Sequence, residues 1–377
     1  MKYWRGYLVA AIFAACTWGL TEFAKTHTVL VDMIYPYVTR MAQNFLVGWS
    51  GNVEYCLWQT LLLVMGVLVL ASIVLMVVLR WNPIQWFGWV CAAAAIVVFL
   101  NTGIYGLNEY AGPLAEDIQL RESEYTVTEL EKAADYYREQ AEKLATQVRR
   151  NGDGTVEYAD FKTLAAQAGN GFENLTYEKS LSVFAGSTVP VKELGWADYF
   201  TSKGITGTMV GVTGEAAVNP QTPPVMRPYA MCREMAHRMS IAIDRDAMFA
   251  AYLACMNNED VQFRYSGALM AYYYCHEALK AIDAATGGSA ASRVSGKNTE
   301  LLHTDMQLCE SFLKSDADEA NGMCDLLVSW HIQEVVLPTL IVEEELFDPL
   351  DPSQVDLSGL VHAPETQPET ENEENAG

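Results

Sequence analysis

The sequence predicts a mainly α-helical membrane protein with three regions. Residues 1–107 carry three long apolar stretches, which are typical of membrane-spanning helices. Residues 108–342 show helical periodicity interrupted by a stretch rich in Gly, Thr and Pro, which predicts a mostly helical soluble domain with a small β component. Residues 343–377 are acidic, rich in Pro, Thr and Asn, and poor in large apolar side chains, which predicts a disordered tail.

The apolar stretches lie at about 6–23, 57–79 and 84–107, each near the roughly 20 residues that a helix needs to cross the hydrocarbon core. Residues 61–79 contain no charged side chain, which favours a membrane span over a soluble helix with a polar stripe. A signal peptide is the alternative for the first stretch, because Lys2 and Arg5 precede a short apolar core.

Basic residues near the spans predict the orientation. Lys2 and Arg5 flank the first span and Arg80 lies in the turn between the second and third, which places the N-terminus in the cytoplasm. The C-terminal domain is then extracytoplasmic. Lys25 and Arg40, in the first outer loop, weigh against this orientation. Four tryptophans suit an interfacial belt on the cytoplasmic side: Trp4, Trp81, Trp86 and Trp89.

The charge balance excludes nucleic acid as an expected partner. The chain carries 47 acidic and 24 basic residues, a formal net charge of −23, without the clustered basic surface that phosphate binding requires. The expected partners are the lipid bilayer and a protein or peptide in the cell envelope, and the oligomeric state is left open. The tail could alternatively serve as a binding arm for a cationic partner.

The soluble part contains five cysteines, an odd number. We expect most of them to be small buried apolar groups. One bridge is an alternative if the domain lies in an oxidising compartment, for example between Cys309 and Cys324.

A strong helix is predicted over 126–149, with Thr126 or Thr128 as its cap and apolar residues at helical spacing. Asn151-Gly152-Asp153-Gly154 then breaks it. The stretch 149–161 resembles an EF-hand calcium loop, but Arg149 stands at its first ligand position and Asp160 at its last, where a bidentate Glu is needed. A plain turn is therefore the favoured interpretation.

Residues 233–237, Arg-Glu-Met-Ala-His, correspond to the zinc-binding helix signature His-Glu-x-x-His with its first histidine replaced. Arg233 cannot be a ligand, since a guanidinium stays protonated and has no lone pair. We expect this motif on a helix over 229–240, followed by a second helix over 244–256. Asp246, nine residues after His237, could turn back toward it as a third ligand.

The stretch between Gly195 and Pro228 is predicted to form short strands. In metallopeptidases an edge strand beside the active-site helix often holds extended substrate, so Gly214, Glu215 and Asn219 are candidates for a substrate wall. A structural hairpin is the equally weighted alternative.

The order and spacing of these features resemble an uncharacterised family of bacterial membrane proteins, a domain-of-unknown-function family with three N-terminal spans and a zincin-like external domain bearing His-Glu-x-x-His. The resemblance extends to about Leu337 and is carried by the spans and by four segments: 204–219, 233–237, 244–247 and 263–267. It implies a zincin-like (α+β) fold for the soluble domain. In that family the position of Asp246 is normally a glutamate.

Carried over residue by residue, the resemblance places Glu234 at the general-base position, His237 and Asp246 at the second and third zinc-ligand positions, and Arg233 at the lost first one. No cofactor is expected, and zinc only if the site is active. We hypothesise that Arg233 pairs with Asp246 or Glu234, because carboxylates left facing each other without a metal need a cation. An accidental match on a surface helix is the alternative.

The expected function is a degenerate, inactive metallopeptidase-like module that binds, scaffolds or senses at the cell envelope. The main alternative is an active membrane-anchored metallopeptidase with an altered ligand set. His276, in the second near-match His276-Glu277-Ala278-Leu279-Lys280, could then supply a ligand. A transporter is a weaker third class, because three spans form a small bundle and only Glu22, near a span end, is charged.

Overall fold

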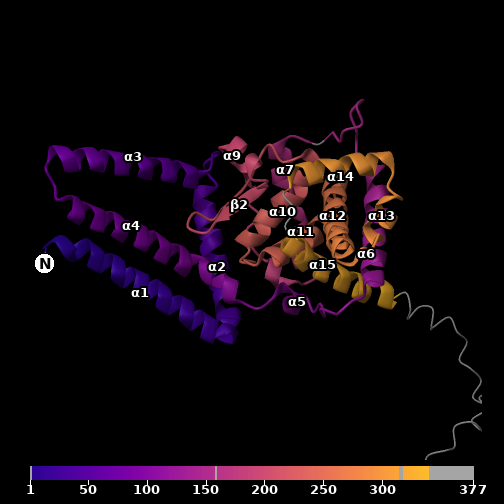
Figure 1. The fold of residues 1–377 in the computed structure, drawn as a ribbon, viewed down its shortest axis with the longest axis horizontal. Helices are drawn as coiled ribbons and strands as arrows, with labels where there is room; N and C mark the ends of the chain where they lie inside the picture. Colours follow the sequence, from indigo (N-terminus) through magenta and orange to yellow (C-terminus); the bar gives the residue numbers. More distant parts are fainter. Residues whose placement is uncertain (1, 158, 314–316, 339–377) are drawn as a thin grey trace, which may run out of the picture. The chain divides into compact units, whose positions relative to one another are not determined.

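The computed structural model describes residues 2–157, 159–313 and 317–338 of the chain. The chain divides into two units, residues 1–331 and 332–377. In the second unit, Ile332–Val336 form a π-helical segment. The first unit is mainly helical with one small sheet, as the sequence predicts (Figure 1). The predicted acidic tail, 343–377, falls outside the described residues.

Three helices of the described part are long and apolar enough to cross a membrane: α1 (Arg5–Thr26), α3 (Leu57–Val78) and α4 (Pro83–Ile104). They coincide with the three predicted stretches to within a few residues. Helices α1 and α4 pack side by side, and Gly6 and Gly88 permit this, since a Cβ on Gly6 would lie 2.4 Å from the carbonyl carbon of Gly88. Tyr7 Oη donates to Ile84 O over 3.0 Å, so the N-terminus and the α3–α4 turn share one end of the bundle.

The segment between the first two spans, expected as a loop, is a helix, α2 (Thr28–Ser50). Only His27 separates it from α1. One face of α2 packs on the soluble domain: Thr39 Oγ1 shares a hydrogen bond of 2.9 Å with Ser240 Oγ, and Gln43 donates to Gly211 O over 3.0 Å. These tertiary contacts stabilise a segment whose mixed composition gives a weak helical signal.

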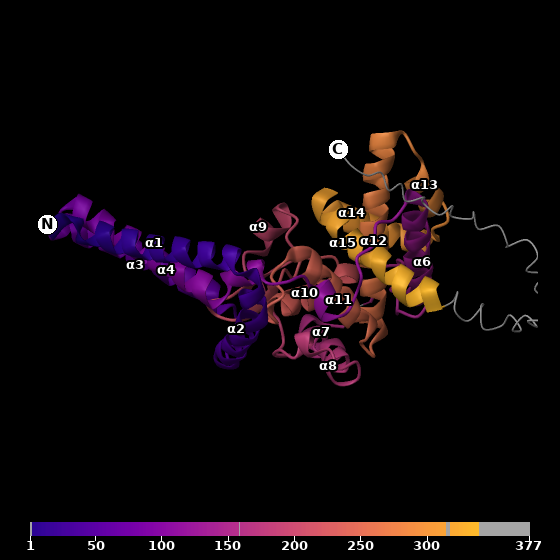
Figure 2. The ribbon, with the colours of Figure 1, turned by 90° about the horizontal axis from the view of Figure 1, so that it is seen from below.

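The region after α4, predicted as the soluble domain, is built around α12, whose residues from Phe263 to Leu279 are almost all buried. Helices α6, α10, α11 and α15 pack against it (Figure 2). The helices of this region are α5 (Leu114–Asp117), α6 (Val127–Ala145), α7 (Phe161–Gln167), α8 (Asn170–Tyr177), α9 (Ala197–Ser202), α10 (Arg227–Arg238), α11 (Asp244–Met256), α12 (Val261–Thr286), α13 (Ala290–Ser295), α14 (Glu300–Phe312) and α15 (Ala317–His331).

The predicted start of α6 and the turn that follows it are confirmed, but the helix ends at Ala145, four residues before the predicted end at Arg149. Thr126 caps α6 in a capping box, in which its Oγ1 accepts from Glu129 N and its backbone N–H donates to the Glu129 carboxylate over 2.7 Å. Gly154 adopts a positive φ of 85°, and Arg150 bridges to Val156 as an antiparallel pair. The stretch is a turn between two paired residues.

The sheet of the described part has three short strands in the order β1–β3–β2: β1 (Lys192–Glu193), β2 (Gly207–Val210) and β3 (Glu215–Val218). Strand β3 pairs parallel with β1 and antiparallel with β2. Helix α10 packs on β2 and β3. Within the described residues β2 is therefore an edge strand beside the helix that carries the motif.

A buried ion pair connects the sheet to the membrane region. Lys192 Nζ lies 2.6 Å from Glu215 Oε1, and both side chains are buried. The Glu215 carboxylate also accepts the backbone N–H groups of Leu57 and Trp58 over 2.8 and 2.9 Å. These N–H groups begin α3 and have no partner within that helix, so Glu215 caps a membrane span from the β-sheet.

Every cysteine lies in the described part, and all eight are unpaired thiols, with the five of the soluble domain buried. Their expected packing role is thus confirmed. The Sγ atom of Cys324 lies 3.7 Å from that of Cys275, so Cys275 is a close thiol neighbour of Cys324.

Candidate functional site

The motif lies on α10, which ends beside the start of α11. Pro228 stands in the first turn of α10, where its missing N–H costs nothing. At the other end Ser240 adopts a positive φ of 74°, which reverses the chain within a few residues and brings Asp244, the first residue of α11, back to the last turn of α10. The motif and the N-terminus of α11 thus form one site.

Glu234 is buried beneath strand β2, with 1% of its surface exposed. Gly207 makes room for it, because a Cβ at that position would lie 2.9 Å from Glu234 Oε1. Burial raises the pKa of the Glu234 carboxyl, although the nearby Arg233 guanidinium opposes that shift. Arg233 Nη1 lies 3.5 Å from Glu234 Oε1.

His237, Asp244 and Arg233 form a polar cluster. His237 Nδ1 lies 2.9 Å from the backbone oxygen of Ile241. Nε2 lies 3.3 Å from Asp244 Oδ1, and Arg233 Nη2 donates to that same oxygen over 2.7 Å. The hydrogen bond from His237 and the charge of Arg233 hold the pKa of the Asp244 carboxyl well below its usual range.

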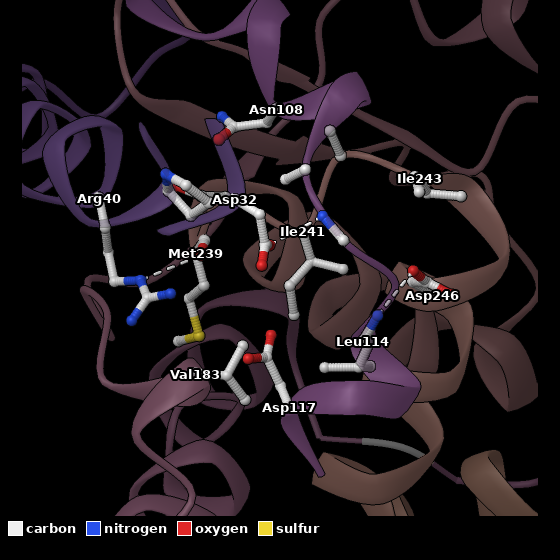
Figure 3. Close-up of a pocket in the computed structure, with 15 residues that line it drawn as sticks. Asp32, Arg40, Asn108, Leu114, Asp117, Val183, Met239, Ile241, Ile243 and Asp246 are labelled. Atoms are coloured by element: carbon white, nitrogen blue, oxygen red, sulfur yellow. Dashed lines mark hydrogen bonds between the residues drawn. The ribbon is translucent and has the colours of Figure 1, made fainter. Parts of the chain in front are cut away.

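Asp246, the expected third ligand, lies away from this cluster. Its Oδ2 accepts the backbone N–H of Leu114 over 3.0 Å, and its Oδ1 lies 3.4 Å from Arg245 Nε. It borders a small cavity of about 40 Å³ that Asp32 and Asp117 also line (Figure 3). Asp244, and not Asp246, is thus the carboxylate of α11 beside His237. Of the two partners expected for Arg233, Glu234 lies 3.5 Å away, and Asp244 is closer than either, at 2.7 Å.

The three candidate wall residues also lie elsewhere. Glu215 is committed to Lys192 and to the start of α3. Gly214, with a positive φ of 70°, packs on α2, where a Cβ would lie 2.9 Å from Val47 N. Asn219 is buried and donates to Ile205 O over 3.2 Å, so it supports the wall of a neighbouring cavity from behind.

That cavity, of about 310 Å³, lies beside Arg233. Its walls are the chain entering β2, the N-terminal half of α10 and the middle of α12. The residues lining it are Lys203, Gly204, Ile205, Thr206, Gly207, Met226, Tyr229, Ala230, Arg233, Met270, Tyr274 and Leu313. The predicted wall segment thus borders a cavity, but through residues 204–207.

The comparison with known families gives one match. Residues 31–324 match the family model described as "Protein of unknown function (DUF3810)". The chain belongs to this family. The match extends from α2 to α15, which agrees with the expected kinship to an uncharacterised membrane family. No curated protein and no solved structure matches the chain.

Metal-ligand geometry in this DUF3810 chain lies away from the motif. Among the described residues, one group of three potential ligands lies close enough together to share a metal ion: His276, Glu277 and Glu310. Lys280 Nζ already lies 2.6 Å from Glu277 Oε1 and 3.4 Å from Glu310 Oε1, so an ammonium neutralises both carboxylates. At the motif, Arg233 likewise places a side-chain cation beside two carboxylates, those of Glu234 and Asp244.

Asp244 was not among the predicted site residues of this DUF3810 chain, although it contacts both Arg233 and His237. The available signal was its position as the first residue of α11, at the end of a short connection from His237. Tyr105 was also missed: its Oη donates to His237 O over 2.9 Å from the end of α4, and this contact joins the third span to the motif helix.

Proposed function

We propose that this chain is an integral membrane protein of the cell envelope whose zincin-like domain has lost metallopeptidase activity and binds extended peptide. The observation that carries the proposal is the Arg233–Asp244 ion pair lying against Nε2 of His237. In a zinc site of this motif, a metal ion would lie where His237 Nε2 points.

The residues around His237 do not fit zinc. A catalytic zinc ion needs three protein ligands, and the motif contributes His237 alone, because Arg233 repels a dication and Asp244 is engaged by it. Glu234 would then have no metal-activated water to act on, since lowering the pKa of water toward 7 is the contribution of the metal. We therefore interpret Glu234, which is buried, as a residue kept for its packing and not for catalysis.

The cavity beside Arg233 supports a binding role. It lies along the start of edge strand β2, and an unpaired strand edge can hold an extended peptide through backbone hydrogen bonds. The charged residues among those that line it, Lys203 and Arg233, are both basic. We therefore propose a peptide that places a carboxylate against Arg233.

Topology supports an extracytoplasmic position for the domain. Tyr7 contacts Ile84, so the N-terminus and the α3–α4 turn lie at the same end of the bundle. That end carries Lys2, Arg5 and Arg80, which favours the cytoplasmic side. Helix α2 and the soluble domain contact each other and so share the opposite side.

A peptide-retention experiment tests the function. The detergent-solubilised full chain is incubated with a peptide mixture from digested casein, and bound and free peptides are compared by mass spectrometry. We expect retention of intact peptides by the native chain and loss of retention in Arg233→Ala. The control is Tyr177→Ala, an exposed position that does not line the cavity. Cleavage that disappears in Glu234→Gln would instead support the active metallopeptidase.

A further inference from the structure

Helix α2 exposes an apolar face. Leu30, Ile34, Tyr37, Met41 and Phe45 recur three or four residues apart, which places them on one side of the helix, and their exposed fractions run from 40% at Leu30 to 77% at Phe45. Further exposed apolar residues extend this face at its edges and ends: Val29, Met33, Val38 and Trp49. A contiguous apolar surface of this kind on a helix indicates an interaction site.

Asp32 lies on the opposite side of α2, and Arg40 lies on its flank, where the guanidinium is 5.4 Å from the centre of the Tyr37 ring. The helix is wholly within the described residues, and it contains only Asp32 and Arg40 as charged groups. Asp32 Oδ1 accepts the backbone N–H of Gly112 over 2.8 Å, and Arg40 Nη1 donates to Ser182 O over 2.9 Å. The domain thus provides partners for both charges, and no residue of the apolar face is itself charged.

The ends of α2 are attached to membrane spans. Its first residue follows α1 after His27 alone, and α3 begins at Leu57, shortly after α2 ends at Ser50. In its middle, Tyr35 Oη donates to Thr102 O, in the last turn of α4, over 3.0 Å. Figure 1 shows α2 crossing the ends of these spans where they meet the soluble domain. Because the domain covers one face of α2, the apolar face is left uncovered next to the ends of the spans.

We propose that α2 lies in the plane of the membrane interface, with its apolar face immersed in the boundary between lipid headgroups and acyl chains. Tyr37 and Trp49 suit this depth, since aromatic side chains with a polar group concentrate at the interface. A lipid surface also explains why the face lacks charge over its whole length, as interfacial helices bury an apolar face beneath the headgroups.

The proposed contact gives the membrane a direct mechanical link to the motif. Thr39 on α2 contacts Ser240, and Arg40 Nε donates to Met239 O over 3.2 Å. Met239 and Ser240 belong to the short connection between α10 and α11. The position of α2 in the bilayer therefore fixes the height at which the candidate site stands above it. This inference does not depend on the proposed peptide-binding function.

Photocrosslinking of the full chain tests the proposal. The variants carry p-benzoylphenylalanine at Phe45 or Met41 on the apolar face, at Leu63 in α3 as a lipid-exposed reference, or at Tyr177 as an exposed position of the soluble domain. Each is reconstituted into vesicles of equal parts phosphatidylethanolamine and phosphatidylglycerol and irradiated, and adducts are identified by mass spectrometry.

We expect lipid adducts at Phe45 and Met41 at a level comparable with Leu63, and several-fold above Tyr177. Crosslinking of Phe45 to a second copy of the chain would overturn the proposal in favour of a protein interface. Lipid adducts at Leu63 with only background levels at Phe45 and Met41 would overturn it in favour of a water-facing helix.

Discussion

Arg233 Nη2 donates to Asp244 Oδ1 over 2.7 Å, and so links the last turns of α10 to the first residue of α11. The same oxygen lies 3.3 Å from His237 Nε2. A side-chain cation and an imidazole thus share one carboxylate oxygen. In the proposed account, the arginine keeps the two helices docked and also removes the chemistry of the site.

Removal of this cation is expected to destabilise the protein modestly. Arg233→Ala leaves Asp244 without its ion-pair partner and buried Glu234 without a nearby positive charge. Because Asp244 is largely exposed, we expect a loss of about 1 kcal/mol, or roughly 2–4 °C in Tm. Thermal unfolding of the full chain in detergent measures it.

Two comparisons make that result specific. Lys162→Ala removes a cation from a more exposed pair, with Glu54, and should cost less. In an Asp244→Ala background, Arg233→Ala should lose most of its effect, because the pair is already broken. An unchanged Tm in Arg233→Ala, or full additivity with Asp244→Ala, would remove the docking role.

The buried carboxyl of Glu234 predicts a pH-dependent stability. Its folded-state pKa is raised by burial above the unfolded value of about 4.3, so ionisation costs the folded state free energy. This cost is absent below about pH 4 and grows as the pH rises from there. Glu234→Gln, which mimics the neutral carboxyl, should therefore be more stable than the native chain at pH 7 and equal to it near pH 4.

Glu131→Gln is the matched control for that measurement. A hydrogen bond from Arg293 lowers the pKa of the Glu131 carboxyl, so its charged form stabilises the folded state above the unfolded pKa. This variant should show no gain at pH 7. A Tm difference between Glu234→Gln and the native chain that is independent of pH would contradict the assigned burial effect.

The Lys192–Glu215 pair is expected to be essential for the fold. Lys192→Ala leaves the Glu215 carboxylate buried without its cation, which typically costs about 3–5 kcal/mol. Lys162→Ala removes a lysine from an exposed pair with Glu54 and should have little effect. Protease sensitivity and Tm of the two full-length variants decide this. Equal behaviour of the two would refute a structural role for Glu215 and return it to the candidate wall.

The thiol geometry predicts which bridge an oxidant can form. The sulfur atoms of Cys275 in α12 and Cys324 in α15 lie 3.7 Å apart. Oxidation by copper-phenanthroline, which accepts two electrons while the thiols release two protons, should therefore form a disulfide between them. Burial raises the pKa of the Cys275 thiol, so the reaction should be slow. Peptide mapping should find this bridge in Cys309→Ser and lose it in Cys275→Ser. A Cys309–Cys324 peptide would contradict the prediction.

Local signals predicted much of the fold. The Thr126–Glu129 capping box and the periodicity of α11 are short-range features, and both helices form where expected. Helix α2 was missed because Asp32, Pro36 and Arg40 interrupt its apolar pattern. The first and last of these are satisfied by Gly112 and Ser182, far along the chain, and no local pattern reveals such partners.

The candidate site, like the fold, could be predicted only in part from local sequence patterns. The motif identified the helix face of Arg233, Glu234 and His237, but not which carboxylate of α11 faces it. Asp244 and Asp246 are two residues apart, a rotation of about 200° around a helix, so they point in nearly opposite directions. Only the packing of α11 on α10 decides between them. The pairing of Glu215 was not predictable for a similar reason, since its partner Lys192 precedes it by more than twenty residues.

The metal content of the purified full chain tests the central claim most directly. Elemental analysis is applied to the native protein and to Arg233→His and His237→Ala, each dialysed against zinc and then against buffer. The account predicts no bound zinc in the native protein and about one equivalent in Arg233→His, where a second imidazole joins His237 and frees Asp244. About one equivalent of zinc in the native protein, lost in His237→Ala, would contradict it.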